Sequence, residues 1–146
     1  MKHEQGVFIA RSFIEETLRN VPKSGKRPLE PFQTLAANDK LPIQILEDAA
    51  VINGVEVHKQ EGDLWLCLEG EVVFIHGGEL VNPTEKENPD GSRNSNELRS
   101  ADIKDGQTDI LRAGDWLWIP PGVPHQHNCE GVARLAIIKI PTPRTF

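Results

Sequence analysis

Two short segments of the sequence carry side chains suited to binding a metal ion. The first contains Glu56, His58 and Asp63, and the second ends on His125. Imidazole nitrogens and carboxylate oxygens together suit Zn, Mn, Fe, Co or Ni, and this mixture does not choose among these metals. The residue types therefore point to one divalent transition metal.

The local patterns indicate how the chain could bring these side chains together. Glu56 and His58 are two residues apart, so in a strand they project from the same face. A turn containing Gly62 can bring His58 and Asp63 onto one interior. In the second segment, prolines and a glycine at positions 120–124 predict a rigid bend that fixes His125 with little entropy lost on binding.

The elements that must position these residues are predicted to be strands. Residues 51–58 resemble a strand, a tight turn and a second strand, and Glu69-Gly70 between apolar runs is a hairpin signal. Further short strands are expected at residues 43–46, 103, 108–111, 116–119 and 133–140. Many short strands separated by turn residues predict an all-β sandwich or barrel.

Two other regions flank or interrupt the predicted strands. Ser12 followed by Glu15 is a capping-box pattern that predicts a helix through about Arg19, and Pro22 ends it. The sequence from there to residue 42 is typical of an extended arm, so residues 1–42 precede a barrel over 43–146. A polar insertion around residues 82–109 is expected to form a surface excursion or a lid.

Composition excludes several classes of protein. The formal net charge of −6 argues against a nucleic-acid-binding surface. No apolar run approaches the length that spans a bilayer, and residues 1–6 lack the apolar core of a signal peptide, so we expect no membrane partner and a cytoplasmic location by default. Cys67 and Cys129 lack C-x-x-C spacing and are expected to be free thiols.

The second segment resembles the second motif of the cupin superfamily. That motif matches Gly114, five residues, Pro120, one residue, Gly122, two residues and His125. The first cupin motif reads His, one residue, His, three or four residues, Glu, six residues, Gly, and here it is degenerate. In the register that keeps this spacing, it falls on Glu56, His58, Asp63 and Gly70. A second register would pair His58 with Gln60, leaving only two residues before Asp63.

The chain thus looks like a small single-domain, cupin-2-like protein, and the resemblance implies a jelly-roll β-barrel with an interior site. By that resemblance, His58, Asp63 and His125 are metal ligands, with Glu56 as a fourth ligand or a catalytic acid/base. Two carboxylates would make the site harder and more anionic than the three-histidine form of the family. A cupin barrel that has lost its metal is the alternative.

Three classes of function follow. The first is a metal-dependent enzyme acting on a small polar molecule, of dioxygenase or of isomerase/lyase type. The second is a small-molecule-binding cupin without turnover, and the third is a metal-free structural barrel.

Other residues are expected to have supporting roles. His76 is expected to be structural, and Gln60 and His127 are expected to be exposed or to support the ligands. The tryptophans are expected in the core or a pocket wall; they are Trp65, Trp116 and Trp118. Strand parity turns the side chains of Leu64, Leu66 and Leu68 outward, where they could cover the partner sheet of a homodimer or pack beneath the N-terminal segment.

Overall fold

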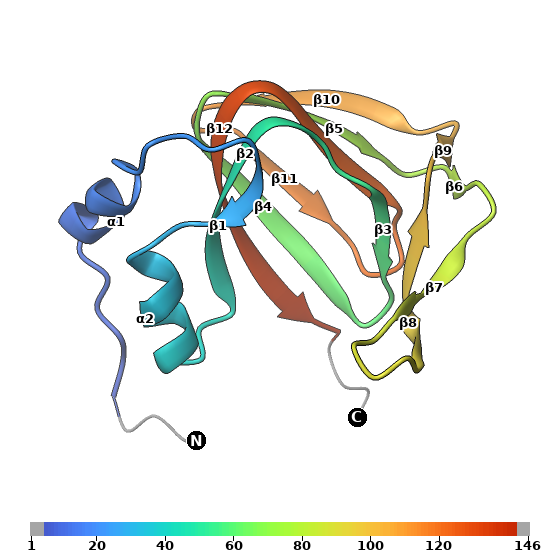
Figure 1. Ribbon diagram of the computed structural model, residues 1–146, viewed down its shortest axis with the longest axis horizontal. Helices are drawn as coiled ribbons and strands as arrows, with labels where there is room; N and C mark the ends of the chain where they lie inside the picture. Colours follow the sequence, from blue (N-terminus) through green and yellow to red (C-terminus); the bar gives the residue numbers. More distant parts are fainter. Residues whose placement is uncertain (1–4, 143–146) are drawn as a thin grey trace.

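The computed structural model describes residues 5–142, in which two short helices lie beside a barrel of antiparallel strands (Figure 1). The helices are α1 (Arg11–Thr17) and α2 (Phe32–Asn38). The strands are β1 (Gly25–Pro28), β2 (Ile43–Ile52), β3 (Val55–His58), β4 (Glu61–Glu69), β5 (Glu71–His76), β6 (Glu79–Leu80), β7 (Thr84–Glu87), β8 (Arg93–Ser100), β9 (Ile103–Lys104), β10 (Gln107–Arg112), β11 (Trp116–Ile119) and β12 (His125–Pro141). Residues 1–6 were predicted to lack the apolar core of a signal peptide, and residues 1–4 of this stretch lie outside the described range.

The long strand β12 joins the two halves of the barrel. Near its start it pairs with β3 and β5, and farther along it pairs mainly with β2 and β4. An irregularity between Cys129 and Val132 separates the two parts. One half runs β7–β8–β3–β12–β5–β10 and the other runs β1–β2–β12–β4–β11. The all-β jelly-roll prediction is confirmed.

A sharp corner at Gly70 connects β4 to β5. These strands do not pair with each other, because each pairs with a different part of β12. Gly70 has a φ of +77°, and a Cβ atom there would lie 2.1 Å from the carbonyl oxygen of Val132. The predicted hairpin at Glu69-Gly70 is therefore wrong, since the glycine turns the chain from one half of the barrel into the other.

The barrel interior follows the alternation predicted along β4. Asp63, Trp65 and Cys67 are buried, whereas the intervening leucines are only partly buried. The interior cluster also includes Phe74 and Leu135. The two cysteines are free, as predicted, and both are buried. Trp116 and Trp118 point outward, with exposed fractions of 57% and 44%, so they do not join the interior as Trp65 does.

The N-terminal segment packs on the outside of the barrel and contains more structure than the sequence predicted. Instead of a purely extended arm, it forms β1 and α2, and Phe32 of α2 is fully buried. The capping box is also wrong, because α1 begins earlier, its N-cap is Ala10, and no side chain caps it. Leu68 packs against this segment, which is one of the two arrangements expected for the outward leucines.

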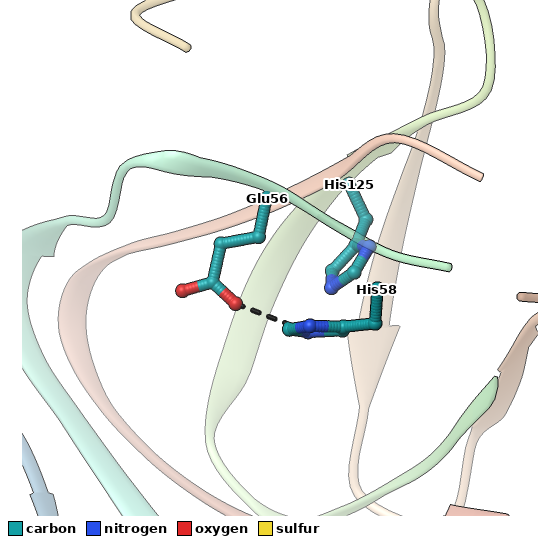
Figure 2. Close-up of side chains that lie close together, drawn as sticks. All are labelled: Glu56, His58 and His125. Carbon is teal, nitrogen blue, oxygen red and sulfur yellow. Dashed lines mark ion pairs between the residues drawn. The ribbon is translucent and has the colours of Figure 1, made fainter. Parts of the chain in front are cut away.

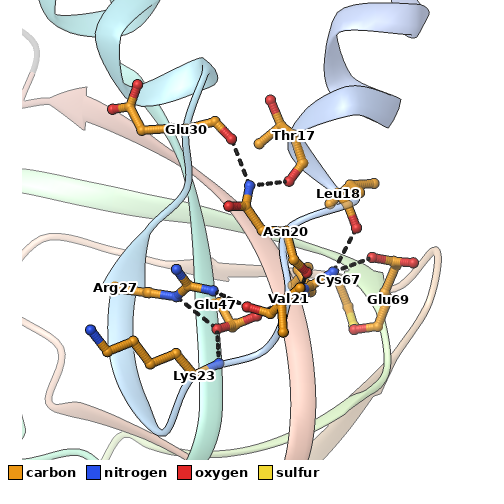
Figure 3. Close-up of polar contacts among 11 residues, drawn as sticks. Thr17, Leu18, Asn20, Val21, Lys23, Arg27, Glu30, Glu47, Cys67 and Glu69 are labelled. Carbon is orange, nitrogen blue, oxygen red and sulfur yellow. Dashed lines mark hydrogen bonds and ion pairs between the residues drawn. The ribbon is translucent and has the colours of Figure 1, made fainter.

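A buried ion cluster fastens the N-terminal segment to the barrel (Figure 3). The carboxylate of Glu47 is fully buried and accepts hydrogen bonds from Arg27 at 2.9 Å and from Arg134 at 2.7 and 2.9 Å. Arg134 also donates to the backbone carbonyls of Leu18 and Asn20. The guanidinium of Arg134 thereby joins a barrel strand to the segment that follows α1.

The polar insertion forms a hairpin that extends the sheet. Its strands β7 and β8 pair with each other, and β8 also pairs with β3, whose residues include Glu56 and His58 (Figure 1). The excursion therefore lies beside the predicted site. Within residues 5–142, no helix is long and apolar enough to cross a membrane.

Candidate metal centre

Strand β3 directs Glu56 and His58 toward one another, as their spacing predicted (Figure 2). Oε2 of Glu56 lies 3.1 Å from Nε2 of His58. Facing them is His125, the first residue of β12, which is paired with Glu56 in the sheet. Potential ligand atoms of these three residues all lie within 4.8 Å of one another.

Asp63 approaches the same two imidazoles from β4. Its Oδ2 atom lies 3.2 Å from Nε2 of His125 and 3.6 Å from Nε2 of His58. The four residues predicted as metal ligands therefore lie near one another, although Asp63 is not part of the group whose ligand atoms all lie within 4.8 Å of one another. Asp63 differs from Glu56 in having a cationic partner, because Nζ of Lys139 lies 2.8 Å from its Oδ1 atom.

The proline-rich bend before His125 is fixed by backbone hydrogen bonds to the neighbouring strands. The N–H of Gly122, which has a φ of +83°, donates to the carbonyl of His58 at 2.8 Å. The carbonyl of Pro124 accepts from the N–H of Gly77 at 2.9 Å. These bonds hold the bend against β3 and the end of β5, and so fix where His125 enters the site.

Each imidazole is oriented through its Nδ1 atom, which leaves Nε2 directed into the site. Nδ1 of His58 lies 2.7 and 2.8 Å from the two carboxylate oxygens of Glu97. Nδ1 of His125 lies 3.1 Å from the carbonyl oxygen of Val123. Such partners fix the tautomer that carries its proton on Nδ1 and presents a lone pair at Nε2, which is the usual arrangement for metal-binding histidines.

Two of the atoms that converge on the site are buried without hydrogen-bond partners. Among residues 5–142, the buried side-chain atoms without a partner are Nε2 of His58, Oδ2 of Asp63 and Nε1 of Trp65. The first two face each other across the site at 3.6 Å, a separation that two ligands of one ion can have. Because buried polar atoms are nearly always satisfied, these two fit a bound cation.

The electrostatics of the site favour charged carboxylates around a basic imidazole. Burial acts to raise the pKa of Glu56, but the contact with His58 and the positive charge of Arg99 outweigh it and hold that pKa far below its usual range. Burial likewise acts to raise the pKa of Asp63, and contacts with His125 and Lys139 lower it.

For His58 the balance has the opposite sign. Burial acts to lower the pKa of this imidazole, whereas its contacts with Glu56, Asp63 and Glu97 raise it above the ordinary value. Three carboxylates around one imidazole give a site that attracts positive charge, whether a proton or a metal ion.

Two histidines outside the cluster have partners of their own. His127 is buried on the same face of β12 as His125, with Nδ1 against the carboxylate of Asp48 and its ring beside Trp65. His127 packs in the barrel interior, and its ring nitrogens are not among the clustered ligand atoms. His76 pairs with an aspartate, its Nε2 lying 2.7 Å from Asp109.

Access to the site is from the side of Glu56. The side chain of Glu56 is 28% exposed, whereas those of His58, His125 and Asp63 are at most 7% exposed. A separate hollow of about 680 Å³ lies at the bend of β12, and none of these four residues lines it. The candidate centre is therefore nearly closed, and Glu56 is its most exposed residue.

This architecture has counterparts among solved structures. The E. coli protein ycfD aligns over 96% of this chain and 38% of its own length, with 18% identical residues and a TM-score of 0.55. The chain has a cupin fold. The Drosophila melanogaster CENP-C cupin domain aligns over 68% of this chain and 61% of its own, with 14% identity and a TM-score of 0.47. A recombinant oxalate oxidase in complex with glycolate aligns over 68% of this chain and 41% of its own, with 18% identity and a TM-score of 0.44.

The similarity to other cupin structures is one of fold. The alignments span 38% to 61% of the length of these three structures. No family model matches the chain, and no curated protein matches it in sequence. The chemistry of this cupin barrel must therefore be argued from its own residues.

Proposed function

We propose that this cupin is a metal-dependent enzyme acting on a small polar molecule. One divalent transition-metal ion would be held by Nε2 of His58 and His125, a carboxylate oxygen of Glu56, and Oδ2 of Asp63. The observation that carries the proposal is that both imidazoles are anchored at Nδ1 while their Nε2 atoms converge with two carboxylates. Imidazole and carboxylate ligands suit Zn, Mn, Fe, Co or Ni.

The two carboxylates would have different roles. Asp63 is buried and forms an ion pair with Lys139 through Oδ1, which holds its carboxylate in place. It would therefore serve as a fixed metal ligand through Oδ2. Glu56 is partly exposed on the side from which a small molecule would enter. It can complete the coordination or, if it stays unbound, move a proton to or from the substrate. The bound ion would supply Lewis-acid chemistry, or a binding position for oxygen atoms of the substrate or of O₂.

The type of reaction depends on which ion the site selects. Two histidines and one carboxylate are the ligands of many non-haem Fe(II) oxygenases, and His58, His125 and Glu56 supply that set. The second carboxylate, Asp63, adds negative charge and suits harder ions such as Mn(II). Dioxygenase chemistry requires a redox-active ion, whereas isomerase or lyase chemistry does not.

Calorimetry followed by an oxygen-uptake screen tests this proposal. Chelator-treated protein is titrated with Mn²⁺, Fe²⁺, Co²⁺, Ni²⁺ and Zn²⁺, with the iron titration under anaerobic conditions. We expect binding of one ion per chain. The loaded protein is then incubated with small sugars, hydroxy acids and aromatic acids while O₂ uptake and product formation are followed.

Each outcome separates the candidate functions. Uptake of O₂ with product supports an oxygenase, and product without O₂ uptake supports an isomerase or lyase. Metal binding without turnover favours a small-molecule-binding cupin. If none of the five ions binds, the enzyme proposal fails and a metal-free barrel remains.

We also propose that the cupin is a homodimer. Trp116 and Trp118 point outward on β11, which pairs only with β4 among the described strands. Edge strands with exposed apolar side chains readily pair with another chain. Light scattering during size-exclusion chromatography should give twice the chain mass of 16.3 kDa, and the mass of a single chain would contradict the proposal.

A further inference from the structure

We propose that Arg99 binds the carboxylate of a small organic acid, while a second oxygen atom of the same acid occupies the metal centre. The inference rests on the metal site proposed above and adds a substrate class to it. Arg99 belongs to β8, a strand of the polar insertion, for which the sequence predicted a surface excursion or a lid.

The register of β8 against β3 places Arg99 on the same side of the sheet as the metal-binding side chains. Arg99 is directly opposite Glu56, and Glu97 is directly opposite His58. Directly paired residues in antiparallel strands project from the same face. The side chains of Arg99 and Glu56 are 31% and 28% exposed, so Arg99 lies at the open side of an otherwise buried cluster.

The guanidinium of Arg99 has hydrogen-bonding capacity to spare. Its Nη1 atom donates to the carbonyl of Leu98 at 3.1 Å, and its Nη2 atom lies 4.0 Å from Oε1 of Glu56. Residues 5–142 provide it with no other polar partner. Since a guanidinium has five N–H donors and prefers two parallel bonds to one carboxylate, most of this capacity remains for a ligand.

Two other charged residues beside the site are already engaged. Lys139 lies between Asp63 and Glu61, at 2.8 and 3.8 Å. Both carboxylate oxygens of Glu97 face Nδ1 of His58. Among the described residues, Glu56 is the anion within 4.0 Å of Arg99, and a divalent ion bound to Glu56 would offset its charge. Lys26 of β1 also acts on Glu56 electrostatically, but Arg99 is the cation that lies within 4.0 Å of Glu56 and would meet an incoming anion there.

These positions define the chemistry of the ligand. It needs a carboxylate for Arg99 and a second oxygen-bearing group within a few bonds, because β8 is adjacent to β3, which carries Glu56 and His58. Small 2-hydroxy acids, 2-oxo acids and short dicarboxylic acids meet this requirement. Neutral sugars and polyols lack the anionic group, and we expect them to bind weakly.

Calorimetry of the cobalt-loaded protein with lactate and its neutral amide, lactamide, tests the inference. Pyruvate and malonate are included as further acids. We expect the parent protein to bind at least one of the acids and to bind lactamide at least tenfold more weakly. Arg99→Gln should weaken acid binding about 10- to 100-fold, because charge-assisted hydrogen bonds are lost. The acid affinity of Arg99→Lys should lie between those of the parent and of Arg99→Gln.

Arg93→Gln is the matched control. Arg93 belongs to the same strand, is exposed, and donates to the backbone carbonyl of Glu85, so its loss should leave acid binding unchanged. Each variant is titrated with Co²⁺ first, and acid binding is compared at saturating metal.

The outcomes distinguish this inference from the metal proposal. If Arg99→Gln binds Co²⁺ and the acids as tightly as the parent, the inference is overturned and the metal site stands. The same conclusion follows if the loaded parent binds none of the three acids, or binds lactamide as tightly as lactate. If the parent does not bind the metal, the proposed function itself fails.

Discussion

Nδ1 of His58 lies 2.7 Å from a carboxylate oxygen of Glu97, a residue 39 positions further along the chain. Glu97 is carried by the polar hairpin that interrupts the barrel sequence, and it reaches the site because β8 pairs with β3. A carboxylate in this position orients the imidazole and increases its basicity as a ligand. The hairpin is therefore part of the candidate metal centre.

We predict that Glu97→Gln weakens metal binding about 10- to 100-fold, the usual effect of removing a carboxylate that orients a metal-bound histidine. The amide can still accept a hydrogen bond from Nδ1, but it lacks the negative charge that makes His58 a stronger ligand. The measurement is the dissociation constant for Co²⁺ or Mn²⁺ by calorimetry. Glu87→Gln, on the exposed strand β7 of the same hairpin, should bind as the parent does. If Glu97→Gln and Glu87→Gln bind the metal with equal affinity, Glu97 does not contribute to the metal site.

The pKa shifts predict how the metal-free protein responds to pH. Because the folded-state pKa of His58 is raised, its protonated form stabilises the fold. That contribution is complete below the unfolded-state pKa of about 6.5 and is lost as the pH rises through the folded-state value. The pKa of Asp63 is lowered, so its contribution is present above about pH 4 and is lost as the pH falls through its folded-state value.

Urea unfolding from pH 5 to 9 in the presence of a chelator measures this effect. The parent should lose stability above about pH 6.5, and His58→Gln should lose less over the same range. Metal binding needs a neutral imidazole, so the metal affinity of the parent should rise with pH over that window. If the parent and His58→Gln show the same pH dependence, the charge assigned to His58 is wrong.

The ion cluster at Glu47 makes a prediction about stability. Arg134→Met should lower the free energy of unfolding by about 3 kcal/mol, since it leaves a fully buried carboxylate with Arg27 as its remaining cation. Arg112→Met removes an exposed pair with Glu71 and should cost less than about 1 kcal/mol.

Limited proteolysis should report a second effect of Arg134→Met. Arg134 holds the carbonyls of Leu18 and Asn20, so its loss should speed cleavage in the segment after α1. Unchanged cleavage together with unchanged stability would show that the cluster does not fasten the N-terminal segment.

The parts of the fold that depend on local patterns could be predicted from the sequence. The two-residue spacing of Glu56 and His58, and the alternation at Asp63, Trp65 and Cys67, each indicate which side chains share a strand face, and the structure agrees. Such patterns depend only on the geometry of an extended chain.

Long-range pairing explains what the sequence did not reveal. Nothing around Gly70 distinguishes a hairpin from a corner, because the deciding contact is with Val132 on a distant part of the chain. The burial of Phe32 likewise depends on the outer face of the barrel, so α2 lacked a local signal. Glu97 and Arg99 lie in a polar stretch, and their relation to β3 depends on a register that no local pattern specifies.

Metal content measured by mass spectrometry, on protein purified without a histidine tag or chelator, tests the central claim most directly. The parent and His76→Ala should each hold close to one equivalent of a transition metal, because His76, although paired with His125 in the sheet, has its Nε2 atom against Asp109 and is not one of the clustered residues. His58→Ala and His125→Ala should hold almost none. A parent that stays metal-free after incubation with Mn, Fe, Co, Ni and Zn, or metal retained in both site variants, would contradict the account.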